Sequence, residues 1–422
     1  MRVTGIIAEY NPFHNGHLYQ LQKARADAGA DYVVIVMSGD FVQRGTPAII
    51  DKYTRTQMAL CNGADLVLEM PVLWSTASAE YFAAAGIAML DKLGVTDTVS
   101  FGVESAQPEL LLQIASILVN EPESYRLHLN RALKQGNSFP VARKNALLDS
   151  GVLSSISADI TQISQILDTP NNILGIEYLK SLQQRNSSIQ PLPIHRQGGG
   201  YHDTNIQPLA SASAIRRSLQ KDPASQQIDT AMPDSALDLL HAYASELPLL
   251  QENHFSSILK YKLLEESHNG YDHYADCSTD LSNRITNALG KYISYSDFCD
   301  LLKSKEVTHT RISRLLLHIL LGIQKEDYLR GRSLDYIPFL RVLGFRKDAT
   351  SLLSEIKKKS SVPMITKVAD AKDILCPKAS TTNFAWQMFE KDIFAANVYN
   401  SVQTDLTGRT MRNEYTHGVV IV

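Results

Sequence analysis

Short apolar runs alternate with helical patterns through the first half of the chain, and this alternation restricts the fold more than any other feature. Residues 32–37 form a near-continuous run of β-branched side chains, which is typical of a strand covered on both faces. Similar runs occur at 3–8, 64–69 and 97–101, and a weaker one with two prolines at 191–194. This order predicts an α/β fold, a doubly wound parallel sheet with helices on both faces.

The pattern changes twice further along the chain. Between about residues 121 and 167 it is helical, which indicates an insertion before the last strand. A polar stretch at 221–227 then precedes a region whose apolar residues mostly recur every 3.6 positions. We therefore expect a first domain over residues 1–225 and a mainly α-helical domain over residues 226–422.

The composition of the 422-residue chain excludes several classes of protein. Hydrophobic residues make up 44% and charged residues 20%, the balance of a folded chain rather than a disordered one. The four cysteines form no Cys-x-x-Cys pair, so we expect no zinc site, iron–sulfur cluster or disulfide framework. We find no signal peptide and no apolar stretch long enough to span a membrane, so we expect a cytoplasmic protein without a membrane partner.

The strongest local signal is EYNPFHNGH, residues 9–17, directly after the first predicted strand. In a doubly wound sheet this point lies at the carboxyl edge, where ligands bind. Gly16 lets the backbone approach a ligand, and the helix that begins here offers unpaired N–H groups to a phosphate. His14 and His17, three residues apart, fall on one side of the first turn and could stabilise charge that builds on an α-phosphate.

These histidines also have simpler interpretations. A lone histidine at a helix start is usually a cap or a surface residue. Two histidines around a glycine, at a strand-to-helix turn and after Asn-Pro-Phe, are a more specific combination. Zinc is a poor alternative, because no third or fourth ligand lies at a recognisable spacing.

The element His14-Asn15-Gly16-His17 resembles the HxGH signature of the nucleotidyltransferase superfamily, which binds ATP and attacks its α-phosphate. Further matches narrow the resemblance to the bacterial tRNA(Met) cytidine acetate ligase family. They are EYNPFHNGHL (9–18), MSGDFVQRGTPA (37–48), GADLVLEMP (63–71), FGVES (101–105), PNNILGIEYLK (170–180) and SASAIRRSL (211–219). A looser match at 308–323 extends the similarity over most of the chain.

The resemblance implies an ATP-dependent acetate ligase. Family members activate acetate as acetyl-adenylate with release of pyrophosphate. They then pass the acetyl group to N4 of the wobble cytidine of elongator tRNA(Met), giving N4-acetylcytidine and AMP. By this resemblance, residues 1–225 form the ATP-binding catalytic domain and residues 226–422 bind tRNA, with Mg²⁺ accompanying ATP. The sequence does not give the oligomeric state.

The resemblance also assigns an ATP site. His14 and His17 form the catalytic pair, and Ser213 and Arg216 match a superfamily element that holds the β- and γ-phosphates. Matched positions elsewhere are Gly102, Arg196 and one of Asn171 and Asn172, between which the sequence does not decide. The nucleotide loop comprises Ile7, Ala8, Glu9, Tyr10, Asn11, Pro12, Phe13, His14, Asn15, Gly16, His17, Leu18, Tyr19 and Gln20.

Each of these residues has a plain structural alternative. Gly102 fits a turn, and either asparagine fits a cap of the helix that follows. The loop at 37–45 follows the second predicted strand and faces the same edge of the sheet, so Asp40 and Arg44 are candidates for an acetate pocket. A guanidinium pairs well with a carboxylate, although Arg44 fits a structural salt bridge equally well.

A polyanion such as tRNA needs a local basic surface, because the net charge of the whole chain is −3. Residues 301–370 hold fourteen basic residues against seven acidic ones, an excess of seven positive charges. Such an excess is typical of contact with a phosphate backbone, although a solvated helix face is the simpler alternative. The candidate contacts are Arg311, Arg314, Lys357, Lys358 and Lys359.

Two other functions stay open. A small-molecule nucleotidyltransferase would share the fold and the ATP loop but would not need the basic segment. A non-catalytic RNA-binding protein on the same fold would not need both His14 and His17. Acetyl-CoA also stays open as the acetyl donor, although the chain has no recognisable loop for the pyrophosphate of CoA.

Overall fold

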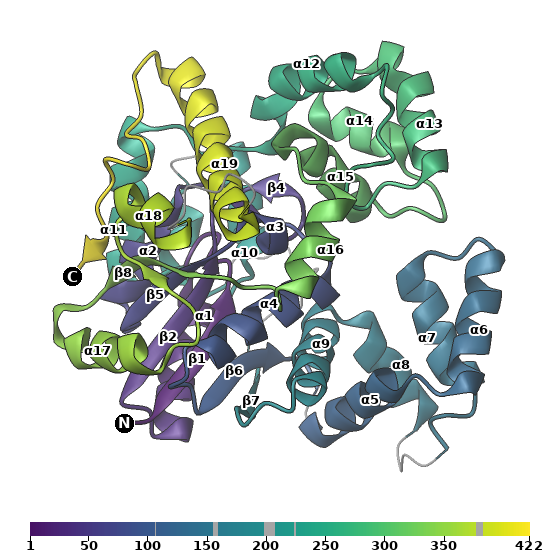
Figure 1. The fold of residues 1–422 in the computed structure, drawn as a ribbon, viewed down its shortest axis with the longest axis horizontal. Coiled ribbons are helices and arrows are strands. Elements are labelled where there is room, and N and C mark those ends of the chain that lie inside the picture. Colours follow the sequence, from purple (N-terminus) through teal and green to yellow (C-terminus); the bar gives the residue numbers. More distant parts are fainter. Residues whose placement is uncertain (106, 155–158, 198–206, 223–224, 377–382) are drawn as a thin grey trace.

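The computed structural model describes residues 1–105, 107–154, 159–197, 207–222, 225–376 and 383–422 (Figure 1). Its centre is an eight-stranded sheet in the order β10-β8-β5-β2-β1-β6-β7, with β9 beside β8. The strands are β1 (Val3–Ala8), β2 (Tyr32–Ser38), β5 (Leu66–Met70), β6 (Thr98–Val103), β7 (Gln190–His195), β8 (Leu340–Phe345), β9 (Met364–Ile365) and β10 (Val420–Ile421). The five neighbours from β5 to β7 are all parallel, which confirms the predicted α/β fold.

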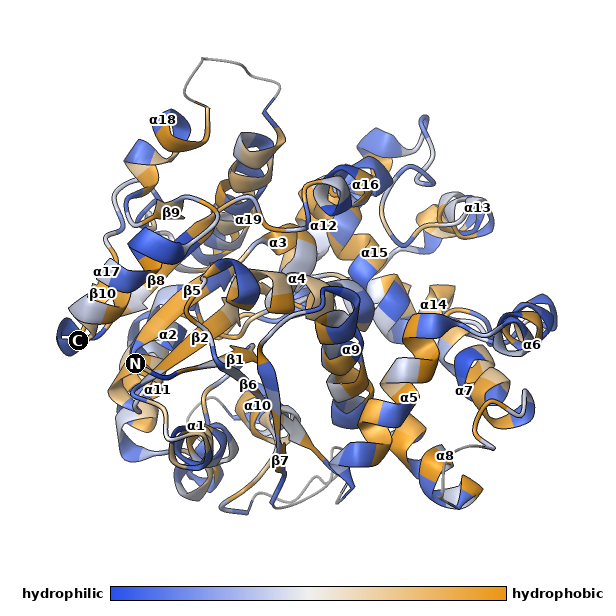
Figure 2. Cartoon of the chain, turned by 60° about the horizontal axis from the view of Figure 1, so that its bottom comes forward, coloured by the Kyte–Doolittle hydropathy of each residue, from blue (hydrophilic) through white to orange (hydrophobic). Residues whose placement is uncertain are grey.

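Alternate side chains of β2 pack into two cores, one on each face of the sheet. Val34 and Val36 join the core that includes side chains of α4 (Ala79–Lys92) and α9 (Pro170–Gln184). Ile35 and its alternate neighbours join the other core. That core includes α1 (Asn15–Ala28), α2 (Lys52–Cys61), α10 (Ala212–Lys221) and α11 (Asp234–Glu246). In Figure 2 the central strands are accordingly mostly hydrophobic.

Two groups of helices stand beside the sheet at the right of Figure 1. The insertion lobe, which covers most of the span predicted at 121–167, consists of α5 (Pro108–Asn120), α6 (Glu123–Lys134), α7 (Phe139–Asp149) and α8 (Ile160–Asp168). The second, here called the helical lobe, consists of α12 (Ser256–Glu266), α13 (Thr279–Ala288), α14 (Tyr295–Leu302), α15 (His309–Leu321) and α16 (Lys325–Ser333). The two lobes approach each other where Gly136 lies next to the carboxylate of Glu306.

The sheet crosses the boundary expected between residues 225 and 226. Strand β8 pairs antiparallel with β5, and β9 and β10 pair with β8, so residues 226–422 add three strands to the sheet. The sequence of β8 gave no clear strand signal, because it places Arg341 in the interior. The other helices and strands are β3 (Phe41–Val42), β4 (Thr46–Pro47), α3 (Val72–Ser75), α17 (Thr350–Lys359), α18 (Ala371–Leu375) and α19 (Phe384–Thr407). Short 3-10 helices are η1 (Gln226–Ala231), η2 (Glu252–Phe255), η3 (Leu289–Lys291), η4 (Lys347–Ala349) and η5 (Val368–Asp370).

A buried cluster of charges ties β8 and the C-terminal tail to α2. Lys52 Nζ lies 2.9 Å from Glu69 Oε1 and 2.8 Å from Glu414 Oε2. Arg341 pairs with the same two carboxylates, at 2.9 Å from Glu69 Oε2 and closely with Glu414. All four side chains are buried, and a third buried carboxylate, that of Asp40, lies 3.7 Å from Lys52 Nζ.

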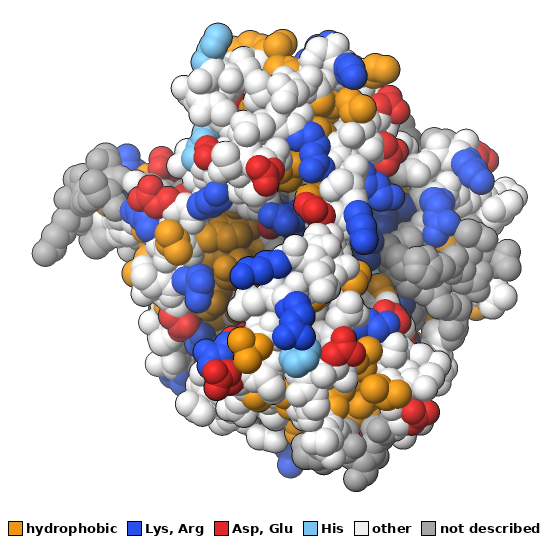
Figure 3. Space-filling view, turned by 90° about the vertical axis from the view of Figure 1, so that its right-hand side faces the viewer, with side chains coloured by type: hydrophobic (Ala, Val, Ile, Leu, Met, Phe, Trp, Pro, Cys, Tyr) orange, Lys and Arg blue, Asp and Glu red, His pale blue; other side chains and the backbone are white. Residues whose placement is uncertain are grey.

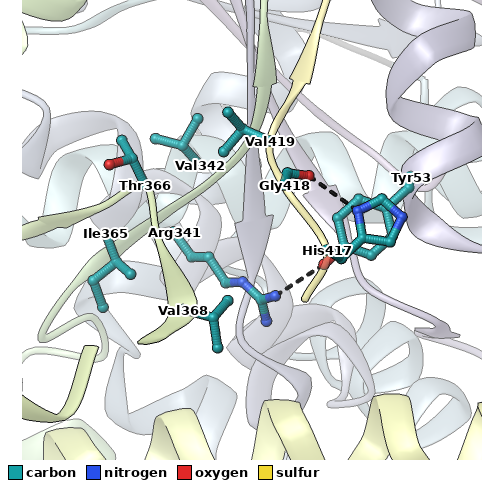
Figure 4. Close-up of a pocket in the computed structure, with 9 residues that line it drawn as sticks. All are labelled: Tyr53, Arg341, Val342, Ile365, Thr366, Val368, His417, Gly418 and Val419. Atoms are coloured by element: carbon teal, nitrogen blue, oxygen red, sulfur yellow. Dashed lines mark hydrogen bonds between the residues drawn. The ribbon is translucent and has the colours of Figure 1, made fainter. Parts of the chain in front are cut away.

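A small pocket lies over this cluster, between β8, β9 and the tail (Figure 4). Arg341 donates a hydrogen bond to Tyr53 Oη at 3.2 Å, and the Tyr53 ring stacks on His417 with centroids 3.4 Å apart. None of the residues of the nucleotide loop lines this pocket, so it belongs to the packing of the tail.

The first prediction concerns the stability of this cluster. Glu414→Gln leaves Lys52 and Arg341 short of one negative charge in the interior, and we expect a loss of about 3–5 kcal/mol in the free energy of unfolding. Urea unfolding measures it. Glu355→Gln is the control, because the pairs of Glu355 with Lys358 and Lys359 lie at the surface, where water screens them, and removing them should change stability far less. Equal losses in both variants would contradict the account.

The same carboxylate predicts a pH dependence. Burial raises the pKa of Glu414, but the attraction of Lys52 and Arg341 outweighs it and lowers the pKa from 4.5 to about 2. The folded state therefore binds fewer protons than the unfolded state between these values. The contribution of Glu414 to stability is present above pH 4.5 and is lost as the pH falls toward 2, and Glu414→Gln removes this part of the acid sensitivity.

Candidate active site

The centre of the site is the turn between β1 and α1, where two histidines are held by backbone N–H groups. Gly16 N donates to His14 Nδ1 at 3.0 Å, and His14 N donates to His17 Nδ1 at 3.3 Å. His14 is the N-cap of α1, and the two bonds form a reciprocal capping box. The imidazole rings stack with centroids 3.8 Å apart. The predicted pair therefore lies together, at the carboxyl edge of the sheet.

These bonds decide which nitrogen carries the proton. A neutral imidazole that accepts at Nδ1 has its hydrogen on Nε2. Burial, together with the nearby guanidinium groups of Arg196 and Arg216, lowers the pKa of His14 from 6.5 to about 3. Burial also lowers the pKa of His17 well below 6.5, with His14 adding to the effect. Both rings are neutral at pH 7, and each offers one Nε2–H donor.

Gly16 is required by the close approach of the His14 ring. A Cβ at this position would lie 2.8 Å from His14 Cε1 and 3.0 Å from its Nδ1. A methyl group there would push the ring off the backbone N–H that holds it. The glycine of the HxGH element therefore keeps His14 in place, in addition to freeing space for a ligand.

The loop before the histidines is fixed by its neighbours. Asn11 Oδ1 accepts from Ile49 N at 2.9 Å, and Glu9 Oε1 accepts from Gln43 N at 3.0 Å. The ring of Tyr10 is buried and contacts the ring of His17, with centroids 4.8 Å apart. These contacts leave the shape of the loop with little freedom.

Two further residues of the predicted loop make hydrogen bonds to other segments, and the others are described by their place in the fold. Asn15 Nδ2 donates to the carbonyls of Pro208 at 3.0 Å and Thr230 at 2.9 Å, which anchors the start of α1. Gln20 Nε2 donates to Ser100 O in the middle of β6 at 3.4 Å. The others lie in β1 (Ile7, Ala8), in the turn (Pro12, Phe13) and in the first turns of α1 (Leu18, Tyr19).

Helix α10 brings the two predicted phosphate residues to this turn. Arg216 donates from Nη1 to Asn11 O at 2.6 Å and from Nη2 to Ser213 Oγ at 3.2 Å. The helix is capped by Ser211, whose hydroxyl accepts from Ala214 N at 3.2 Å. Arg216 and Ser213 thus lie together beside the nucleotide loop, as the matched element requires.

Strands β6 and β7 bring the other predicted residues to the same edge. Gly102 and Arg196 are adjacent, because a Cβ on Gly102 would lie 3.2 Å from Cγ of Arg196. Arg196 N donates to Val103 O at 2.9 Å and so continues the pairing of the two strands. Gly102 therefore makes room for the stem of Arg196. Residues 198–206, which include most of the HRQGGGYHD segment after β7, lie outside the described residues.

The structure separates the roles of the two asparagines. Asn172 is buried, and its Oδ1 accepts from the backbone N–H groups of Glu104 at 2.9 Å and Ser105 at 3.2 Å. Its amide therefore shapes the loop after β6. Asn171 is half-buried and donates to the carboxylate of Glu104. Sequence reasoning did not single out Glu104, although it lies within the matched FGVES segment.

The two candidates for the acetate pocket differ in their surroundings. Asp40 is buried, accepts from Lys52 N at 2.9 Å and lies 3.7 Å from Lys52 Nζ. Burial raises the pKa of Asp40 to about 6, against the attraction of Lys52. The carboxylate of Asp40 therefore binds the start of α2 through Lys52. Arg44 is half-buried in the β3–β4 hairpin, and the carbonyl of the neighbouring Gly45 accepts from Ser313 Oγ of α15 at 2.9 Å.

The predicted RNA contacts lie on two distant parts of the molecule. Arg311 and Arg314 are on α15, where both donate to Asp276, Arg314 through an ion pair of 2.8 Å. Lys357, Lys358 and Lys359 are on α17 at the opposite, amino edge of the sheet, where Ser351 Oγ lies 2.6 Å from Tyr32 Oη at the start of β2. The charge excess counted along the sequence also includes the buried Arg341, so it does not form one surface.

Among the residues that the structure describes, no three histidine, cysteine, aspartate or glutamate side chains converge as metal ligands. No helix of this described part is both long and apolar enough to cross a membrane.

Comparison with known proteins places the chain in a family. Residues 1–414 match the family model described as HIGH Nucleotidyl Transferase. The tRNA(Met) cytidine acetate ligase of Thermoanaerobacter sp. (strain X514) is 42% identical over 94% of this chain and 95% of its own length. That of Acetivibrio thermocellus is 38% identical over the full length of both chains.

Solved structures agree with this relation. The crystal structure of Thermotoga maritima TmcAL bound with alpha-thio ATP has a TM-score of 0.91, with 31% sequence identity and full coverage of both chains. The apo form of the same protein has a TM-score of 0.93. This chain belongs to the tRNA(Met) cytidine acetate ligase family, which confirms the relation inferred from its motifs.

The second prediction concerns the protonation of the histidine pair. Because the pKa of His14 is about 3 in the folded protein and 6.5 ordinarily, its NMR signals should not titrate between pH 5 and 8. The unfolded chain takes up a proton near pH 6.5 and the folded chain does not, so His14 lowers stability as the pH falls from 6.5 toward 3. A midpoint near pH 6.5 for either ring would contradict the lowered pKa of the buried pair.

Proposed function

We propose that this chain activates acetate with ATP and acetylates N4 of the wobble cytidine of elongator tRNA(Met), forming N4-acetylcytidine. The observation that carries the proposal is the turn of His14 and His17, with two Nε2–H donors fixed at the carboxyl edge of the sheet. Full-length similarity to tRNA(Met) cytidine acetate ligases supports the choice of substrates. A tRNA substrate places the activity in the cytoplasm.

The contacts of the site support a specific orientation of ATP. The triphosphate lies over the start of α1, where the positive end of the helix dipole attracts anions. Arg216 and Ser213 of α10 bind the β- and γ-phosphates, and Arg196 binds from the side of β7. The nucleoside lies toward Gly102 and Asn171, since the amide of Asn172 is already used by the backbone of Glu104 and Ser105.

In the first half-reaction an acetate oxygen attacks the α-phosphorus, and the bond to the β-phosphate oxygen breaks. Pyrophosphate leaves with the electron pair of that bond, and acetyl-adenylate remains. The Nε2–H groups of His14 and His17 donate to the phosphate oxygens on which charge increases. Because both rings are neutral before and after, they act as hydrogen-bond donors rather than as acids.

Magnesium enters this scheme as part of the substrate. With no converging set of three acidic or histidine ligands among the described residues, the chain offers no protein cage for the ion there. Mg²⁺ is held mainly by phosphate oxygens and water in many ATP sites, and it neutralises charge on the departing pyrophosphate.

In the second half-reaction the N4 amine of cytidine attacks the acetyl carbonyl. The C–O bond to the phosphate breaks, AMP leaves, and the amine gives up one proton. The mixed anhydride is already reactive, so holding the two groups together supplies much of the acceleration. The base has to leave its stack in the anticodon loop to reach the site. Arg44 stays our candidate for binding the acetate carboxylate, and Asp40 supports the loop that carries it.

The face between the insertion lobe and the helical lobe is our candidate for the tRNA surface. Lys and Arg side chains gather around the middle of this face (Figure 3). Arg311 and Arg314 belong to the helical lobe, and the β3–β4 hairpin links that lobe to the loop after β2. The lysines of α17 lie at the other edge of the sheet and are less well placed to bind an RNA whose base enters the site.

The third prediction tests the first half-reaction. Wild-type protein should catalyse acetate-dependent exchange of labelled pyrophosphate into ATP without any RNA. His14→Ala and His17→Ala should each lower the exchange rate on the order of 10²–10³-fold, the usual loss for one charge-stabilising donor. Far-ultraviolet circular dichroism checks that both variants stay folded. Exchange without acetate would favour a small-molecule nucleotidyltransferase, and normal exchange in both variants would refute the assigned pair.

The fourth prediction separates the two basic groups. Arg311→Glu should weaken tRNA binding and acetylation, whereas replacing Lys357, Lys358 and Lys359 together by glutamate should change neither. Each lost phosphate contact reduces the salt slope of binding by about 0.7–0.9. RNA-free exchange should stay normal in both variants, since neither touches the nucleotide loop. If only the α17 variant loses tRNA affinity, the RNA surface lies at the amino edge.

A further inference from the structure

Helix α2 carries two fully buried cations with very different partners. Lys52 Nζ has three carboxylates within 4 Å, those of Asp40, Glu69 and Glu414. Arg55, three residues later, is 0% exposed, and in the described part of the chain no carboxylate lies within 4.0 Å of its guanidinium. One helix therefore buries one cation in direct ion pairs and one that the carboxylate of Asp40 attracts only from beyond 4.0 Å.

The guanidinium of Arg55 is bonded to backbone carbonyls instead. Nη1 donates to Glu9 O at 2.7 Å and to Ser38 O at 3.0 Å, Nη2 donates to Gly39 O, and Nε donates to Ile50 O at 3.1 Å. Glu9 follows β1 directly, and Ser38 ends β2. A single planar group thus joins the carboxyl ends of two adjacent strands to the segment that leads into α2.

A second arginine, Arg25, also donates to backbone carbonyls of neighbouring segments, but it has a direct ion pair, which Arg55 lacks. Arg25 at the amino edge donates to the carbonyls of Asp31 at 2.7 Å and Gly63 at 2.9 Å, which also joins neighbouring segments. Arg25 is in addition paired with the carboxylate of Asp65. The corresponding link at the edge where the nucleotide loop begins has no such carboxylate beside it.

A buried charge without a direct ion pair is costly, and the carbonyl dipoles and the more distant carboxylate of Asp40 compensate the charge of Arg55 only in part. We propose that Arg55 is a positioning residue that fixes the nucleotide loop against the loop after β2, and that its charge attracts the anionic substrates. The inference rests on the proposed function, because it takes the ligands at this edge to be the phosphates of ATP and the carboxylate of acetate. Arg55 acts through the loops and does not contact the reacting atoms.

The two parts of this proposal predict different results for two substitutions. Arg55→Met removes the charge and the hydrogen bonds, whereas Arg55→Lys keeps the charge and loses the planar set of donors. The equilibrium affinities for ATP and for adenosine are then compared. Because only ATP is an anion, their ratio separates the effect of the charge of Arg55 from the effect of the shape of the site. Rates of acetate-dependent exchange then report how well the two loops are aligned.

We expect Arg55→Met to weaken ATP binding by about tenfold or more relative to adenosine, the size of effect for one nearby charge in a partly shielded interior. Arg55→Lys should keep the ratio of ATP to adenosine affinity and lower the exchange rate. Arg25→Met is the control, because it removes a similar link at the other edge and should change neither quantity beyond a general loss of stability.

Several outcomes would overturn the proposal. The proposal is wrong if Arg55→Met weakens the binding of ATP and of adenosine equally. It is also wrong if the Arg55→Lys variant catalyses acetate-dependent exchange at the wild-type rate. The lysine variant also decides the matter if the methionine variant does not fold. Absence of exchange in the wild-type protein would refute the proposed function instead, whereas the ATP-to-adenosine ratio would still test the charge of Arg55.

Discussion

Two hydrogen bonds, in which backbone N–H groups hold the Nδ1 atoms of His14 and His17, determine the geometry of the site. They stabilise the start of α1, fix the orientation of both rings, and leave the proton of each neutral imidazole on Nε2. Capping and chemistry therefore use the same atoms. A helix cap that is ordinary in its geometry becomes a pair of donors because it stands at the carboxyl edge of a parallel sheet.

The surrounding structure keeps this turn in one shape. Strands β1 and β2 are covered on both faces by apolar cores, so their ends are rigid supports for the loops that follow. Arg216 and Asn11 tie the turn to α10 and to the segment before α2. At a greater distance, the buried cluster of Lys52, Arg341 and two glutamates holds the C-terminal tail against α2. The site is thus prepared by contacts between segments far apart in the sequence.

Local features of the sequence predicted the parts of the structure that local interactions determine. The apolar runs gave the parallel strands, and the histidine spacing gave the paired rings, because a strand and one helical turn depend on nearby residues. Strand β8 was missed, since Arg341 is tolerated in the sheet only with Glu69 and Glu414 beside it. The basic excess at 301–370 was misleading as a single surface, because the chain passes through β8 between α15 and α17 and places the two groups at different sites. Likewise, only the bonds to Glu104 and Ser105 distinguish Asn172 from Asn171.

Under the proposed function, one protein carries acetate from ATP-dependent activation to a single base of one tRNA. Mass spectrometry of elongator tRNA(Met) incubated with the protein, ATP and isotopically labelled acetate, followed by digestion to nucleosides, tests this transfer. The account predicts labelled N4-acetylcytidine at the wobble position, dependent on both ATP and acetate. An unmodified wobble cytidine, or acetylation that requires acetyl-CoA and not acetate, would contradict it.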